Sequence, residues 1–171
     1  MPVVHYPFIF DFKQPISGNG FLAGVEITGG RALMLHEDGQ WWMHGVFPSA
    51  ISECGSTSQE CFLRYREELK TILYDFAEEA GDFSAFDEKV GTFFRQPSAD
   101  ADLWTAAQQK LRAGTVKADE NEEFIQKLPK EKPAARKMNF RITRLDQSVA
   151  NEPRVEFRPA DNYVSLPAMA A

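Results

Sequence analysis

The sequence predicts an α+β fold in which an antiparallel β-meander is covered by one long helix. Two observations predict it. Residues 21–54 hold short apolar stretches separated by tight-turn residues, which is typical of strands joined by hairpins. Residues 57–81 place apolar side chains at helical spacing between a capping residue and a glycine, which indicates an amphipathic helix. Hydrophobic residues make up 43% of the 171 residues, which is enough for one domain with a core of its own.

The N-terminal residues predict a first strand. Four aromatic side chains alternate with other residues and therefore share one face of it: Tyr6, Phe8, Phe10 and Phe12. Pro7 has no N–H to donate, which favours a position at the edge of a sheet. Two interpretations stay open, because this strand either docks into the core of its own chain or adds to the sheet of a neighbour. Residues 13–20 contain Pro15, Gly18 and Gly20 and are expected to form a loop.

The central meander is expected to contain four strands. They are residues 21–28, 31–36, 41–47 and 51–54. Gly29-Gly30 is expected to turn the chain between the first two strands. Asp38-Gly39 is expected to form a two-residue hairpin turn between the second and third, because both residues tolerate positive φ.

The Asp38-Gly39 turn fixes the register of its hairpin, so that His36 opposes Trp41, and Met34 opposes Met43. One face then collects Leu33, Leu35, Trp42, His44 and Val46, and the other collects Ala32, Met34, His36, Trp41 and Met43. Both faces are apolar, which a sheet open to water on one side would not be. The second face is therefore expected to be covered by other parts of the chain or by a partner. On that second face, His36, Trp41 and Met43 are candidate partner-binding residues.

The long helix is expected to begin after Thr57. Thr57 with Glu60 three residues later makes a capping box, and Gly81 is expected to end the helix. Its apolar side consists of Phe62, Tyr65, Leu69, Ile72, Leu73, Phe76 and Ala80. Its other side carries Glu67, Glu68, Thr71, Asp75, Glu78 and Glu79. A solvated face is the simpler interpretation of these acidic residues. A surface for a basic partner is the alternative, with Glu67, Glu68 and Asp75 as candidate binding residues.

Two shorter helices and a C-terminal arm are expected to follow. The second helix is centred on Phe86 and Val90, and the third is expected to be capped by Ser98 and to present Trp104 on its apolar side. The predicted organisation is a body over residues 1–114, a charged, proline-containing linker over residues 115–137, and a strand pair with a tail over residues 138–171. The strand pair rests on the alternation of Met138, Phe140 and Ile142, which Val155 and Phe157 repeat. This arm has three possible neighbours: the body, a second copy of the chain, or another protein.

The residues at the start of the long helix carry a family resemblance. Phe47-Pro48 closes a strand pair, and Gly55-Ser56-Thr57-Ser58-Gln59-Glu60-Cys61 opens the helix. This order resembles the HicB family of antitoxins over about residues 21–80. The resemblance implies a partial RNase H-like β-β-β-α-β domain without catalytic residues, which binds and blocks a small ribonuclease toxin. The chain departs from the family in a shorter loop before Gly55 and in lacking a C-terminal DNA-binding pattern.

Charge and hydropathy limit the partners. Residues 1–126 hold 20 acidic and 10 basic groups, whereas residues 127–158 hold 4 acidic and 9 basic groups. An acidic body disfavours nucleic acid and favours a basic protein. The sequence contains no run of about 18 apolar residues, so it predicts no membrane span. The N-terminus lacks a signal pattern. The expected compartment is therefore the cytoplasm, where Cys54 and Cys61 are expected to stay reduced.

The sequence predicts no cofactor, no metal site and no enzyme. It holds three histidines, no Cys-x-x-Cys and no His-Glu-x-x-His. Glu26 and Glu53 are the carboxylates within the four expected strands of the meander, too few for two-metal catalysis. The leading hypothesis is a HicB-like antitoxin or adaptor that binds another protein. The alternative is a structural subunit of a larger assembly, phage- or defence-related, which exchanges its terminal strands with its neighbours. An enzyme ranks last.

Overall fold

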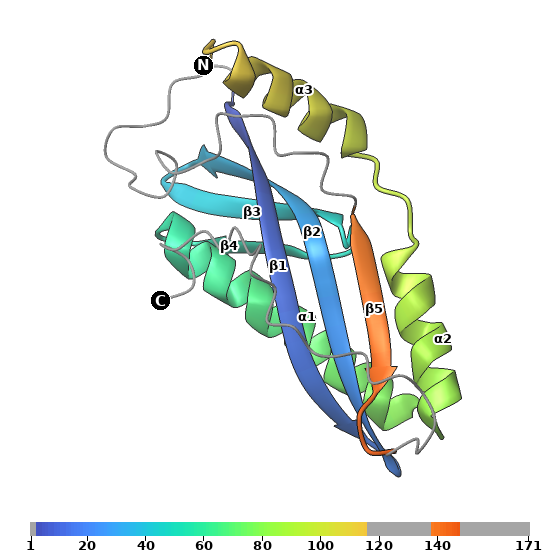
Figure 1. Ribbon diagram of the computed structural model, residues 1–171. Helices are drawn as coiled ribbons and strands as arrows, with labels where there is room; N and C mark the ends of the chain where they lie inside the picture. The colour runs from blue at the N-terminus through green and yellow to red at the C-terminus, as the bar shows by residue number, and fades with distance from the viewer. Residues whose placement is uncertain (1–2, 116–137, 148–171) are drawn as a thin grey trace.

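The computed structural model describes residues 3–115 and 138–147. Its elements, in chain order, are β1 (His5–Gly18), β2 (Phe21–Glu37), β3 (Gln40–Phe47), β4 (Ser52–Gly55), α1 (Ser58–Glu79), α2 (Phe83–Phe94), α3 (Ala101–Arg112) and β5 (Asn139–Arg144). Figure 1 shows α1 running behind the sheet, α2 beside β5, and α3 at the end of the sheet where β1 begins. The predicted α+β class, an antiparallel meander covered by a long helix, is confirmed.

The strands form one antiparallel sheet in the order β1-β2-β3-β4, with β5 paired to β2. β2 is the strand around which the sheet is built. Along one side it pairs with β1 over nearly its whole length. On its other side, residues 23–28 of β2 pair with β5, and residues 31–37 pair with β3. In this sheet β1 is therefore an edge strand, as Pro7 led us to expect.

Two parts of the predicted meander are wrong. Residues 13–18 belong to β1 and form no loop, and the chain turns instead at Asn19-Gly20, between the paired residues Gly18 and Phe21. Gly29-Gly30 forms no turn either, because β2 continues through it. Four strands therefore precede α1 in the described part of the chain. The first is the expected N-terminal strand, lengthened to Gly18, and the second combines the expected strands 21–28 and 31–36.

A β-bulge explains why Gly29 does not reverse the chain. The register of β1 and β2 shifts between Phe10 and Phe12, which leaves one extra residue in β2. Gly29 takes φ 66°, a left-handed conformation that glycine adopts without steric cost. Its N–H donates to Asp11 Oδ1 at 2.8 Å. The bulge bends β2 where its neighbour changes from β5 to β3, which is a common use of bulges.

The β2–β3 hairpin has the predicted register. His36 pairs with Trp41, and Met34 pairs with Met43. The turn residues Asp38 and Gly39 both have positive φ, at 52° and 76°, as a type I′ turn requires. The register shifts once, next to Arg31, so that the far end of β3 is bulged as well.

α1 begins as predicted and covers the inner face of the sheet. The Thr57 hydroxyl accepts a hydrogen bond from the Glu60 N–H at 3.0 Å, which makes Thr57 the N-cap. The Glu60 carboxylate accepts from the N–H and hydroxyl of Ser56, one residue earlier than in a standard capping box. These hydrogen bonds from Ser56 lower the pKa of Glu60. The buried side chains of α1 that meet the sheet include Phe62, Tyr65, Leu69 and Leu73.

Of the two covers expected for the second face of the hairpin, other parts of the chain or a partner, the structure shows the first. Four residues of that face lie in the main core together with the buried side of α1: Ala32, Met34, Trp41 and Met43. The sheet curls around α1, so that the chain itself covers this apolar face. α3 covers part of the opposite face, where Trp104 packs with Leu33 and Val46 in a second, smaller cluster.

α2 and β5 lie side by side and pack on the main core (Figure 1). Phe140 of β5 lies 5.0 Å, between ring centroids, from Phe94 of α2, and Ile142 also packs on the main core. β5 thus pairs with the sheet of its own chain, which is the first of the three neighbours expected for this arm. The expected linker and the second strand around Val155 and Phe157 lie outside the described residues, apart from Thr115. The third helix is capped at Asp100, and Ser98 instead accepts from the Asp100 N–H.

Candidate functional site

The candidate partner-binding residues on the hairpin fall into two groups. Trp41 is 3% exposed and Met43 is 0% exposed, so neither side chain can touch a partner in this structure, and their prediction as a binding surface is wrong. His36 is exposed at the tip of the hairpin. Its ring lies 5.1 Å from the ring of Trp41. His36 therefore covers the end of the core and keeps one side to solvent.

The exposed face of α1 is the second predicted surface, and the structure leaves it open. Glu67, Glu68 and Asp75 are all exposed. The same helix also exposes Leu63 at 42% and Tyr74 at 38%. Leu63 and Tyr74 are eleven residues apart, which places them on the same side of α1, about 16 Å from each other at 1.5 Å per residue.

We define the α1 face by the exposed residues Leu63, Glu67, Glu68, Tyr74, Asp75 and Glu78. Two of the basic residues of α1 are engaged elsewhere, because Arg64 pairs with Glu60 at 2.6 Å and Arg66 lies over the ring of Phe62. Lys70 is the third. The α1 face therefore combines two apolar side chains with a negative surround, an arrangement that attracts a cationic surface and gives it apolar contacts.

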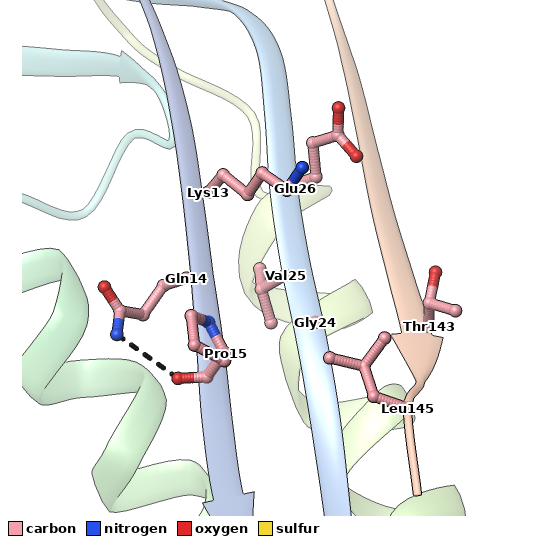
Figure 2. Close-up of a pocket in the computed structure, with 8 residues that line it drawn as sticks. All are labelled: Lys13, Gln14, Pro15, Gly24, Val25, Glu26, Thr143 and Leu145. Carbon is pink, nitrogen blue, oxygen red and sulfur yellow. Dashed lines mark hydrogen bonds between the residues drawn. The ribbon is translucent and has the colours of Figure 1, made fainter. Parts of the chain in front are cut away.

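A hollow in the outer face of the sheet is a second candidate site, which the sequence did not indicate. It has a volume of about 190 Å³ and lies where β1, β2 and β5 run side by side. Figure 2 shows Pro15 on the β1 side, Gly24 in the middle, Thr143 and Leu145 on the β5 side, and Lys13 with Glu26 at one end. The hollow exists because Gly24, in the central strand, has no side chain to fill it.

A Ser–His pair lies on the outer face of β3 and β4. His44 Nδ1 and Ser52 Oγ are 2.6 Å apart, from directly opposed positions of the two strands. Trp42 lies beside His44, with 6.1 Å between their rings. A nucleophilic serine needs its histidine to be oriented by a third group. Within residues 3–115 and 138–147, His44 has no such carboxylate partner, so this geometry by itself activates no nucleophile.

The two cysteines lie on opposite sides of β4. Cys61 is fully buried under the sheet, and its thiol donates to the Glu53 carbonyl oxygen at 3.3 Å. Burial raises the pKa of Cys61 to about 12. Cys54 opposes Trp42 and therefore points to the outer face, where it is half-buried. Both thiols are free, as expected.

The described residues hold no cluster of three or more His, Cys, Asp or Glu that is arranged to bind a metal ion. Among the helices in the same part of the chain, none is both long and apolar enough to cross a membrane. In comparisons with known proteins, no family model matches the chain, and no curated protein or solved structure does so either.

Sequence reasoning thus located the α1 face but missed the hollow. The face follows from helical periodicity, which assigns each residue to a side of α1. The hollow depends on β5 pairing with the first half of β2, a contact between segments far apart in the chain. A sequence signal for it is the alternation in residues 21–28, where Gly24 shares one side of the strand with Leu22, Glu26 and Thr28.

Proposed function

We propose that this protein is a non-catalytic, protein-binding module that receives a basic partner on the α1 face. The observation that carries this proposal is the coexistence of exposed Leu63 and Tyr74 with Glu67, Glu68 and Asp75 on one helix. Apolar anchors within a charged surround are typical of protein interfaces, where the charges steer association and the anchors provide affinity.

The resemblance to HicB antitoxins supports the same kind of function. Its residues lie where β3 ends and α1 begins: the Phe47–Pro48 peptide is cis, and Thr57 with Glu60 organises the first turn of α1. Under this proposal the partner is a small basic protein, such as a ribonuclease toxin, which the module neutralises or recruits in the cytoplasm. Four strands precede α1, whereas the family has three, so the proposal rests on the α1 face rather than on the resemblance.

The test is affinity capture from the native cell extract, with charge-reversal variants. The wild-type chain is compared with a variant carrying Glu67→Lys, Glu68→Lys and Asp75→Lys. The matched control carries Asp87→Lys, Glu88→Lys and Asp102→Lys, three exposed acidic residues of α2 and α3. We expect the wild type and the control to capture the same basic protein, identified by mass spectrometry, and the α1 variant to lose it.

Two further measurements sharpen this test. Salt at 0.5 M should release the captured protein, because it screens charge attraction over distances beyond about 4 Å. Leu63→Ala with Tyr74→Ala should weaken the purified complex at least tenfold. The proposal fails if the wild type captures nothing, or if the α1 variant retains the same partner as the control.

A structural subunit that exchanges strands is the second candidate, and the position of β5 favours it. β5 is a late segment of the chain that pairs with β2, and the same pairing can form with the β2 of a neighbouring copy. Size-exclusion chromatography with light scattering separates the two functions. Defined multimers of the purified chain alone would favour the subunit, and a monomer at all concentrations would exclude it.

A further inference from the structure

The hollow lies on a part of the sheet that none of the three described helices covers. α1 and α2 pack on the inner face, and α3 packs near the start of β1 (Figure 1). Pro15, Gly24 and Thr143 are paired across the three strands and form a row of short side chains. Leu145 closes the hollow on one side, and a Cβ atom on Gly24 would lie 3.3 Å from Leu145 Cδ1.

Charges of alternating sign border the hollow. Glu26 is paired with Lys13 of β1 on one side and with Arg141 of β5 on the other. This row is therefore positive, negative and positive across the three strands. The half-buried carboxylate of Glu26 forms no hydrogen bond or ion pair with the residues that the structure describes. A small molecule that carries both a positive and a negative group could place each group beside a side chain of opposite charge here.

The size of the hollow fits one apolar side chain. Its volume is about 190 Å³, slightly more than the roughly 150 Å³ cavity that accepts benzene in other proteins. It is smaller than the roughly 300–1,000 Å³ pockets that hold drug-sized ligands. Pro15, Gly24 and Leu145 supply an apolar floor, and Thr143 supplies one hydroxyl.

We propose that the hollow binds a free α-amino acid with an apolar side chain, of the class of leucine. The side chain of the ligand lies over Gly24. Its ammonium group faces Glu26, and its carboxylate faces Arg141, the neighbour of Glu26 on β5. The hollow borders the α1 face at Pro15, whose carbonyl oxygen accepts from the Tyr74 hydroxyl at 3.5 Å. Binding of the amino acid does not depend on the protein-binding function.

The test is a titration of the full-length, ¹⁵N-labelled chain followed by amide chemical shifts. L-leucine up to 20 mM should shift the amides of Gly24, Glu26 and Thr143 and leave those of α1 in place. Three analogues each lack one part of leucine: glycine lacks the side chain, 4-methylpentanoate lacks the ammonium group, and isoamylamine lacks the carboxylate. Each should bind at least tenfold more weakly than leucine. Equal binding of 4-methylpentanoate, or no shift with leucine at 20 mM, would overturn the proposal.

Two variants give independent readouts. Gly24→Val fills the hollow and should weaken leucine binding at least tenfold, while Thr28→Val, on the same face and strand but outside the hollow, should leave it unchanged. Glu26→Gln should weaken leucine binding at least fivefold without weakening the binding of 4-methylpentanoate. Unchanged leucine binding in the Glu26→Gln chain would contradict the assignment of the ligand's ammonium group to Glu26. Shifts of the same amides with protein concentration alone would mean that a second copy covers the face, which also contradicts the proposal.

Discussion

Gly45 shows how a single residue determines the path of the chain after β3. Its N–H donates to the Ile51 carbonyl oxygen at 2.8 Å, which closes the connection between β3 and β4. The Pro48 carbonyl oxygen accepts a hydrogen bond from the hydroxyl of buried Tyr65 in α1 at 3.4 Å. This connection therefore packs directly on both the sheet and the helix, and it leaves no room beside Gly45.

Gly45→Ala should destabilise the protein by about 3 kcal/mol, because overpacking a buried site forces the backbone to move. The added Cβ would lie 2.2 Å from the Pro48 carbonyl oxygen and 2.8 Å from the Tyr65 hydroxyl. Urea unfolding followed by fluorescence measures the change in free energy. The matched control is Gly81→Ala, where a Cβ meets nothing within 4 Å. A Gly45→Ala chain as stable as the control would contradict this account.

The two thiols should differ in reactivity. At pH 8 the fraction of Cys61 present as thiolate is very small, because burial raises its pKa to about 12 and the thiolate is the nucleophile. We expect the folded chain to react with iodoacetamide at Cys54 alone, and the urea-unfolded chain to react at both cysteines. Mass spectrometry of Cys54→Ser and Cys61→Ser chains assigns each rate. Fast labelling of folded Cys54→Ser would show that Cys61 is accessible.

At the scale of elements, α3 is held by one side chain more than by any other. Trp104 is 2% exposed, and its Nε1–H donates to the Phe8 carbonyl oxygen at 3.3 Å. The guanidinium of Arg31 lies 4.3 Å from the centre of the indole ring, within the range of a cation–π contact. A buried ring, a hydrogen bond and a cation thus converge on a single residue of this helix.

Trp104→Ala should therefore detach α3 while α1 stays folded. Loss of a buried tryptophan costs about 3–5 kcal/mol, and a 12-residue helix is not stable in water by itself. Hydrogen exchange should show rapid exchange of the amides of α3 and continued protection in α1. Leu103→Ala, at a neighbouring side chain that is 40% exposed, should keep α3 protected. Protection of α3 in the Trp104→Ala chain would contradict this role.

The elements that the sequence predicted well are those fixed by local chemistry. The Asp38-Gly39 turn and the Thr57 cap both follow from residues adjacent to them in the chain, and both are confirmed. The Asn19-Gly20 turn carried the same kind of local signal, but the interpretation of residues 13–20 as a loop hid it. Gly29 was misread because a glycine suits both a turn and a bulge, and its role is decided by Asp11 on another strand.

At the scale of the whole molecule, β5 makes the C-terminal segment part of the body. Arg144 donates to Asp146 at 2.9 Å and to the Gly20 carbonyl oxygen at 3.2 Å, and it lies over the ring of Phe83 in α2. Phe140 packs against Phe94. One strand therefore connects the β1–β2 turn, α2 and the sheet.

Phe140→Ala should lower the free energy of unfolding by about 2–3 kcal/mol, because it removes a half-buried ring from this cluster. It should also make the amides of β5 and of residues 23–28 exchange faster, because the two strands lose protection together. Asn139→Ala, an exposed neighbour in β5, is the control and should change neither quantity. Unchanged exchange in residues 23–28 would mean that β5 is not paired with β2 in solution.

The candidate sites follow the same division between local and distant information. The exposure of Glu67, Glu68 and Asp75 was predictable, because helical geometry alone assigns them to the side away from the apolar residues. The burial of Trp41 and Met43 was not, because it depends on the curl of the sheet around α1. The hollow required both the absence of a side chain at Gly24 and the arrival of β5 beside it.

The bulge at Gly29 divides β2 into two halves that are completed at different times during synthesis. The half that pairs with β3 gains its second neighbour as soon as the hairpin leaves the ribosome. The half that pairs with β5 has β1 on one side and must wait for the C-terminal region before its other backbone groups find partners. A nascent chain released before Asn139 would leave that row of donors and acceptors bare, which makes premature termination in this gene a route to aggregation.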